Sequence, residues 1–126
     1  IIFDIYVDKN NNYWIGTTEG LSFFNGDNFQ NFGNTHGIGG KACIRKIGKS
    51  PSGDIIISAG FGWEVFSGHQ LFNYNGISFQ PIEYTKYQTQ VFDFFFDEKN
   101  LIYNTGNRIV IADMLGQQAI NNSIHI

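Results

Sequence analysis

The stretch that decides the fold is Phe3-Asp4-Ile5-Tyr6-Val7-Asp8, because the chain contains it more than once. It returns as Phe92-Asp93-Phe94-Phe95-Phe96-Asp97, and residues 47–57 hold a more divergent copy. The segment that follows is repeated too, since residues 21–29 match residues 71–79. Similar segments at a regular spacing are the signature of a repeat architecture. We therefore predict three related units of roughly 40 to 47 residues each.

Each unit alternates apolar and polar residues with period two, between short turn sequences, which is typical of β-strands. We expect the strands of the first unit at residues 3–7, 13–17, 21–24 and 29–32. The dipeptide Asn25-Gly26 favours a type I′ hairpin turn, because Asn and Gly tolerate positive φ. Asn75-Gly76 is expected to form a short turn at the equivalent place in the second unit. Four short antiparallel strands in about 42 residues are typical of a propeller blade.

The composition supports an all-β domain and excludes several classes of protein. Of the 126 residues, 42% are hydrophobic and 17% aromatic, with thirteen Phe and fifteen Gly, whereas strong helix formers are scarce. A helix bundle is therefore excluded. The net charge of −3 argues against a nucleic-acid partner. No apolar run approaches the roughly eighteen residues of a membrane span, so none is expected in this chain.

The stretch from Asp8 to Leu21 resembles the two-component regulator propeller repeat. The resemblance depends on Asp8, on Trp14-Ile15-Gly16-Thr17 and on Gly20-Leu21, with Asn12 at a position where Gly is usual. It is weaker in the second unit, at Ile56-Ile57-Ser58-Ala59, and in the third, at Ile102-Tyr103-Asn104-Thr105. It gives structural roles in the repeat to Trp14, Gly16, Thr17, Gly20 and Leu21.

The resemblance implies an all-β fold, a segment of a β-propeller with about three four-stranded antiparallel blades. The blades are expected at about 1–36, 40–84 and 88–120, with an irregular C-terminal part in the last. Known propellers have at least about four blades, so three cannot close a ring. The remaining blades are expected either in a longer chain or through self-association.

The resemblance also implies a function in signal transduction. Such propellers form the extracytoplasmic, periplasmic sensor region of bacterial hybrid two-component histidine kinases anchored in the inner membrane. They detect oligosaccharides or related ligands, and the kinase lies outside this chain. The expected function is therefore non-enzymatic ligand sensing, with no cofactor.

The ligand-binding residues are expected on one face of the blades. Because successive strands alternate in direction, the connections after the second and fourth strand of each unit share a face, and all the long connections are there. The candidate residues in these loops are Trp63, Glu64, His69, His36 and Tyr87. Aromatic rings beside polar groups suit sugar rings and hydroxyls. The alternative for Trp63 is that it covers its own blade.

Other functions have weaker sequence support. Asp8, Asn10 and Asn12 match the start of a calcium loop, but Tyr13 occupies the position that requires Gly, so no metal site is expected. Propeller lyases and glycosidases place paired carboxylates at the channel mouth, and here the long loops offer Glu64 and Glu83 alone. A protein-interaction platform is the other alternative, which the sequence does not separate from ligand sensing.

Three further expectations concern side-chain environments. Trp14 is expected to be buried against the next blade. Phe3, Phe23, Phe29 and their copies are predicted to be core residues. The basic residues Lys41, Arg45, Lys46 and Lys49 are interpreted as a solvated strand and its flanks.

Overall fold

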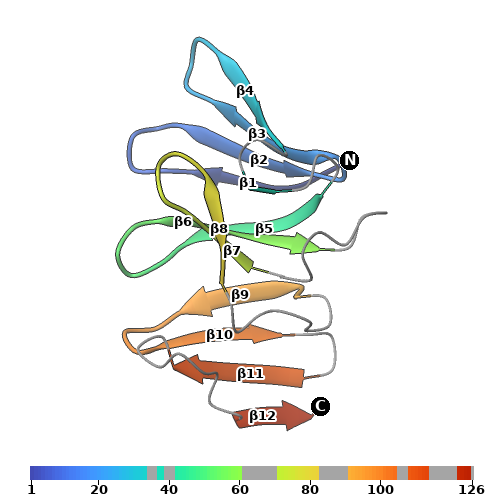
Figure 1. The fold of residues 1–126 in the computed structure, drawn as a ribbon, viewed down its shortest axis with the longest axis vertical. Coiled ribbons are helices and arrows are strands. Elements are labelled where there is room, and N and C mark those ends of the chain that lie inside the picture. The colour runs from blue at the N-terminus through green and yellow to red at the C-terminus, as the bar shows by residue number, and fades with distance from the viewer. Residues whose placement is uncertain are drawn as a thin grey trace.

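The computed structural model describes residues 1–33, 37–38, 42–60, 71–82, 91–104, 108–113 and 122–125 (Figure 1). Within these ranges every regular element is a β-strand. The strands form three antiparallel sheets of four strands each, and neighbours in a sheet follow the order of the chain. The expected all-β fold with four-stranded antiparallel units is confirmed.

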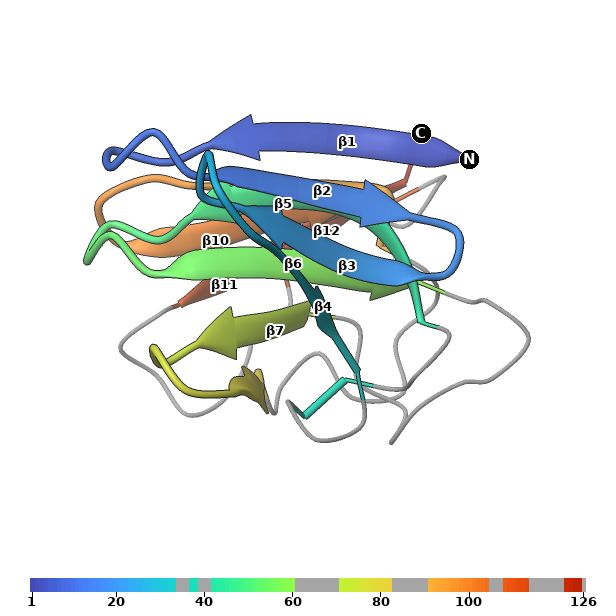
Figure 2. The same cartoon turned by 90° about the horizontal axis from the view of Figure 1, so that it is seen from above.

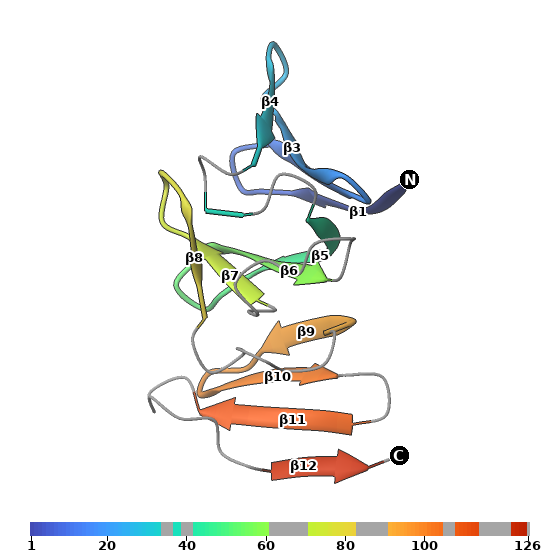
Figure 3. The same ribbon diagram turned by 45° about the vertical axis from the view of Figure 1, so that its right-hand side comes forward.

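The three sheets are arranged one after another along the long axis of the molecule (Figure 1, Figure 3). The first sheet consists of β1 (Ile2–Val7), β2 (Tyr13–Thr17), β3 (Gly20–Phe24) and β4 (Phe29–Phe32). The second consists of β5 (Cys43–Lys49), β6 (Ile55–Gly60), β7 (Leu71–Tyr74) and β8 (Phe79–Pro81). The third consists of β9 (Asp93–Phe96), β10 (Asn100–Asn104), β11 (Arg108–Asp113) and β12 (Asn122–His125). Strand β12 lies beyond residue 120, about where the third unit was expected to end.

The prediction of a type I′ turn at Asn25-Gly26 is wrong. Phe24 pairs with Phe29 across the β3–β4 hairpin, which leaves a four-residue loop between them. Only Gly26 in that loop has positive φ. The Asn25 side chain stabilises the longer loop instead, since its Oδ1 accepts hydrogen bonds from the amides of Asp27 and Asn28. Asn75 makes the same two bonds in the second sheet.

The turn that follows the first strand of each sheet is held by one polar side chain. Asp8 Oδ1 accepts hydrogen bonds from the amides of Asn10 and Asn12, at 2.9 and 3.0 Å. Asp97 Oδ1 accepts from the amides of Lys99 and Asn100 in the third sheet. In the second sheet Ser50 replaces the aspartate, and its Oγ accepts from the amide of Asp54. The three sheets therefore share this turn, although the side chain that accepts the hydrogen bonds is aspartate in two of them and serine in the other.

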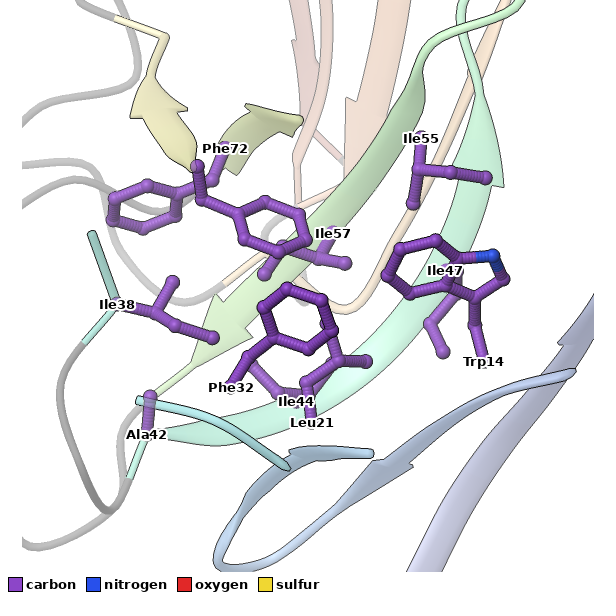
Figure 4. Packing of buried hydrophobic residues seen from close by; sticks show 11 residues of the cluster. Trp14, Leu21, Phe32, Ile38, Ala42, Ile44, Ile47, Ile55, Ile57 and Phe72 are labelled. Atoms are coloured by element: carbon purple, nitrogen blue, oxygen red, sulfur yellow. The ribbon is translucent and has the colours of Figure 1, made fainter. Parts of the chain in front are cut away.

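Two apolar clusters hold the sheets together. The first joins the first and second sheets around Trp14, which is only 4% exposed, so its expected burial is confirmed. The Trp14 ring stacks on Phe32 at 5.5 Å and meets the edge of Tyr74 at 5.4 Å. Figure 4 shows Trp14 and Phe32 facing the aliphatic side chains of β5 and β6. The second cluster joins the second and third sheets and is built around Ile56, Leu71, Val91, Phe94, Leu101 and Tyr103.

The remaining residues of the repeat motif have structural roles in the first sheet. A Cβ atom at Gly16 would lie 2.7 Å from the carbonyl oxygen of Ile44, so only glycine permits this approach of β2 to β5. Thr17 Oγ1 donates to the carbonyl of Gly20, which turns the chain with φ of 125°. Leu21 is buried. Each motif residue thus serves a turn or a contact between sheets.

The prediction that Phe3, Phe29 and their copies are all core residues is wrong in part. Phe3 and its copy Phe92 are 40% and 47% exposed, and Phe29 is 68% exposed. The copy of Phe29 in the second sheet, Phe79, is 1% exposed. Burial therefore depends on which neighbour covers a sheet face as well as on the position in the repeat.

Candidate functional site

The first strands of the three sheets, β1, β5 and β9, are neighbours in space. Strand β5 contacts both β1 and β9, although β1 and β9 are far apart in sequence. Figure 2 shows β1 above β5 at one edge of the molecule, with their strands running in similar directions. Residues at equivalent positions of these strands are therefore brought close together.

A β-bulge near the start of the first strand is repeated in two of the sheets. The register of β1 against β2 shifts between Ile2 and Asp4, and that of β5 against β6 shifts between Ile44 and Lys46. The residue inside each bulge is Phe3 in the first sheet and Arg45 in the second. A bulge redirects one side chain without changing the alternation of the rest of the strand. The repeat places Phe92 at the same position, immediately before β9.

The three residues at this position make direct contact. The guanidinium carbon of Arg45 lies over the Phe3 ring, 4.9 Å from its centroid, and over the Phe92 ring at 5.7 Å. Both distances are within the range of cation–π attraction, which contributes about 0.5–1 kcal/mol at exposed sites. One cation and two partly exposed aromatic rings, each from a different sheet, thus form one surface.

The next position along the three strands carries charged residues that connect the sheets. Asp4 Oδ2 accepts a hydrogen bond from the amide of Ile47 on the neighbouring sheet, at 2.8 Å. Lys46 Nζ lies 3.6 Å from Asp93 Oδ1 on the third sheet. Because Asp93 is well exposed and Lys46 is only half-buried, this ion pair contributes at most about 1 kcal/mol. We call Phe3, Asp4, Arg45, Lys46, Phe92 and Asp93 the inner-strand cluster.

The chemistry of the inner-strand cluster suits a ligand with apolar faces and polar edges. Phe3 and Phe92 offer ring surfaces for stacking. Arginine and lysine provide hydrogen-bond donors for hydroxyl or anionic groups, and the carboxylates provide acceptors. All six residues lie near the start of the first strands, the end of the sheets at which β4, β6 and β8 finish and the long connections begin.

Neither the buried cysteine nor a metal site offers a catalytic centre in the described part of the chain. Cys43 is buried beside the cluster, and burial raises the pKa of its thiol although the charge of Arg45 opposes this shift. A thiol with a raised pKa is a poor nucleophile at neutral pH. In the part of the chain that the structure describes, no three His, Cys, Asp or Glu side chains gather as a metal site would require.

A hollow at the opposite end of the sheets is formed by turn residues. It has a volume of about 320 Å³ and is lined by Lys49, Ser50, Pro51, Phe96, Asp97 and Glu98. Asp97 is committed to the amides of its own turn, whose hydrogen bonds lower its pKa. The inner-strand cluster combines aromatic and charged groups from three sheets and is the stronger candidate.

The ligand-binding residues predicted from sequence lie outside the described residues. These residues are Trp63, Glu64, His69, His36 and Tyr87. Their assignment stays a prediction, as does the alternative use of Glu64 and Glu83 in catalysis.

Sequence reasoning did not find the inner-strand cluster. Arg45 and Lys46 were interpreted as a solvated strand, but both are half-buried and contact the neighbouring sheets. Phe3 and Phe92 were assigned to the core. The missing signal was the bulge, because one extra residue in a strand changes the face on which the preceding side chain lies. The alignment of Phe3, Arg45 and Phe92 was visible in the repeat.

Comparison with known proteins gives no assignment. No family model matches the chain, and a search of curated proteins found no significant match. Within the described ranges there is no helix long and apolar enough to cross a membrane.

Proposed function

We propose that this chain is a segment of a ligand-sensing β-propeller, with each four-stranded sheet as one blade. It has no catalytic role, and its ligand is an oligosaccharide or a related extracellular molecule. By its resemblance to two-component regulator propeller repeats, it belongs to the periplasmic region of a hybrid sensor kinase, where it contributes to signal transduction.

The observation that carries this proposal is the meeting of Phe3, Arg45 and Phe92 at one surface. In a propeller the first strand of each blade lines the central channel, so equivalent residues converge there. The contact of two aromatic rings and a guanidinium group beside the first strands of three sheets supports this proposal. Binding sites are commonly built where a rigid scaffold gathers side chains from several elements.

The pairing of aromatic and charged residues favours a carbohydrate over a purely apolar ligand. A sugar ring stacks its C–H face on an aromatic ring while its hydroxyl groups require donors and acceptors around it. Asp4, Lys46 and Asp93 supply such groups within one residue of the aromatic positions. The loop residues Trp63 and Tyr87, predicted from the sequence as ligand contacts, remain part of this proposal.

The proposal is tested by titrating the chain with a panel of neutral and acidic oligosaccharides and following amide chemical shifts. Binding should perturb Phe3, Arg45 and Phe92 first. Phe92→Ala should weaken binding by about 1–3 kcal/mol, as loss of one aromatic anchor usually does. Phe95→Ala is the matched control, because Phe95 is an exposed phenylalanine of the same region of the chain that lies outside the cluster.

Two results would contradict the proposal. One is equal loss of affinity in Phe92→Ala and Phe95→Ala, which would mean that no specific site is involved. The other is hydrolysis or elimination of a panel member by the chain, which would favour the alternative of a propeller lyase or glycosidase.

A protein-interaction platform is the second candidate function. It is favoured by the exposed apolar residues of the first sheet, among them Tyr13 and Phe29. Such a patch on a soluble protein commonly marks a protein contact. If no oligosaccharide perturbs the inner-strand cluster, this second candidate becomes the better one.

A further inference from the structure

The inner-strand cluster contains two carboxylates, and backbone amides already hold both of them. Asp4 Oδ1 accepts a hydrogen bond from the amide of Ile5, and its Oδ2 accepts one from the amide of Ile47 in the second sheet. Asp93 Oδ1 accepts a hydrogen bond from the amide of Phe94 at 2.8 Å, and the same oxygen takes part in the ion pair between the second and third sheets. Both carboxylates therefore serve first to fix the strands and to join the sheets.

The two cations of the cluster differ in the groups that contact them. Lys46 Nζ lies 3.6 Å from Asp93 Oδ1, so a carboxylate balances its charge. The guanidinium carbon of Arg45 lies 4.9 Å from the ring centroid of Phe3 and 5.7 Å from that of Phe92. An aromatic ring attracts a cation through its quadrupole but has no net charge. These two ring contacts therefore hold the Arg45 side chain without neutralising it.

The two rings also restrict the position of Arg45. Phe3 is part of the first sheet and Phe92 immediately precedes the third, so residues of both neighbouring units contact the guanidinium group. An unrestrained arginine side chain has about 2 kcal/mol of rotamer entropy. A guanidinium group that is already positioned loses less of this entropy when a ligand binds. Its planar set of N–H donors matches the two oxygens of a carboxylate.

Positive charge is concentrated around this position, although the chain as a whole is acidic. The net charge is −3, yet four of the eight basic residues lie between positions 41 and 49. Strand β5 carries Arg45, Lys46 and Lys49 and contacts both β1 and β9. The thiol of Cys43 on the same strand is affected by this charge, since burial raises its pKa and Arg45 opposes the rise. A ligand at the first strands therefore meets the most basic of the described strands.

We infer that Arg45 makes the inner-strand cluster selective for oligosaccharides that carry carboxylate groups, as uronic acids do. The guanidinium group binds the carboxylate, while the exposed parts of the Phe3 and Phe92 rings stack on the sugar. This inference rests on the proposed function, because it names the class of oligosaccharide that the same site binds. It adds one requirement, which is that binding depends on the charge of the ligand and on the charge at position 45.

The test uses two pairs of oligosaccharides whose members differ in charge. Tetragalacturonate and tetramannuronate are each compared with their methyl esters, in titrations of the full 126-residue chain that are followed by amide chemical shifts. We expect at least one acid to bind about tenfold more tightly than its ester, as hydrogen bonds between charged groups allow. Raising the salt concentration from about 50 to about 500 mM should weaken binding of the acid and change that of the ester little.

Variants at position 45 assign the selectivity to one side chain. Arg45→Gln should abolish the preference for the acid over its ester. Arg45→Lys should retain part of the preference, because it keeps the charge but loses the planar set of donors. Lys9→Gln is the matched control, since it removes the same charge at an exposed position in the turn after β1. The comparison of acid with ester in the wild-type chain requires no variant, so it decides the inference even if a variant folds poorly.

The outcomes separate failure of this inference from failure of the proposed function. Equal binding of acids and esters by the wild-type chain, or binding of neutral oligosaccharides alone, would overturn the selectivity and leave ligand sensing in place. Loss of the preference in Lys9→Gln to the same extent as in Arg45→Gln would show that the net charge selects the ligand, and Arg45 would have no special role. If no oligosaccharide binds, the proposed function and this inference both fail.

Discussion

The two internal interfaces of the chain are built from equivalent positions but from different side chains. The first interface, between the first and second sheets, is aromatic, with Trp14 and Phe32 against Tyr74 and Phe79. The second interface, between the second and third sheets, places Ile56 where the first has Trp14. The backbones also meet differently, through Gly16 at the first and through a Ser58 hydrogen bond at the second.

The difference shows that equivalent positions of the repeat can carry different side chains, provided that the residues in contact with them differ as well. Trp14 requires a hydrogen-bond acceptor for its indole nitrogen, and Asp8 Oδ2 provides it at 3.0 Å. In the second sheet, Ile56 has no such requirement, and Ser50 replaces Asp8. Each interface is thus a matched set of residues, so equivalent substitutions should have unequal effects.

Trp14→Ala should have the largest effect and should break the first interface. Loss of a buried tryptophan costs about 3–5 kcal/mol, and here it removes ring contacts to both sheets. We expect the chain to melt many degrees lower or to fail to fold, as measured by circular dichroism. Tyr13→Ala, at an exposed neighbouring position, is the control and should melt close to wild type. Equal melting of Trp14→Ala and wild type would contradict the central role of this ring.

Gly16→Ala should destabilise the chain by about 1–3 kcal/mol, the usual cost of overpacking. The added methyl group would meet the Ile44 carbonyl oxygen at 2.7 Å, so backbone must move. The control is Gly48→Ala, where the nearest atom is a Phe94 ring carbon at 3.2 Å that can shift. Denaturant unfolding of both variants would make the comparison. A larger loss for Gly48→Ala would reverse our view of which interface is tighter.

Ser58→Ala should cost about 1 kcal/mol, because it removes the buried hydrogen bond to the Val91 carbonyl. The effect belongs to the second interface, so it should add to that of Trp14 substitutions at the first. Ser22→Ala removes a hydrogen bond to Asn31 near the surface and should cost less. If Ser58→Ala is as stable as wild type, the hydrogen bond does not contribute to the second interface.

Acid should weaken the first turn through Asp8, with the smallest effect. Partial burial alone would raise the pKa of Asp8, but hydrogen bonds from Trp14, Asn12 and Asn10 outweigh it and lower the pKa. Folding therefore favours the carboxylate. This stabilisation is present above the unfolded pKa of about 4 and is lost as the pH falls through the lower folded value.

The measurement is the free energy of unfolding between pH 7 and pH 3 for wild type and Asp8→Asn. The variant should lose less stability on acidification than wild type does. Asp27→Asn, in an exposed hairpin loop, controls for the change of net charge. An equal acid dependence in wild type and Asp8→Asn would remove Asp8 from the explanation and leave Asp97 as the next residue to test.

The fold was largely predictable because its signals are local and repeated. The strands Tyr13–Thr17 and Phe29–Phe32 coincide with the expected segments, since alternation and turn residues mark them clearly. The type of the hairpin turn at Asn25-Gly26 was not predicted correctly, because hydrogen bonds to the Asn25 side chain stabilise a loop in which only Gly26 has positive φ. The exposure of Phe29 was missed for another reason, since it depends on a neighbouring sheet and the repeat pattern alone carries no such information.

The candidate site was less predictable than the fold. Trp63, His69 and the other loop residues were chosen because they lie in long loops. Loop length indicates where binding residues are common, but it does not predict where a side chain lies in space. Arg45 was overlooked because a basic residue in a strand is usually solvated. Its contacts with Phe3 and Phe92 come from a bulge and from three strands meeting, which are both tertiary properties.

The repeated bulge separates, on one strand, a position that is constrained by packing between sheets from a position that is constrained only by what the surface binds. Position 47 must fill the space between the first and second sheets, whereas positions 3 and 45 lie outside that core. The chain already carries phenylalanine at one bulge and arginine at the other without a change in strand register. A mutation at a bulge can therefore alter what the surface recognises while folding is preserved. Gene duplication followed by drift at this position would give each copy of the repeat a separate specificity.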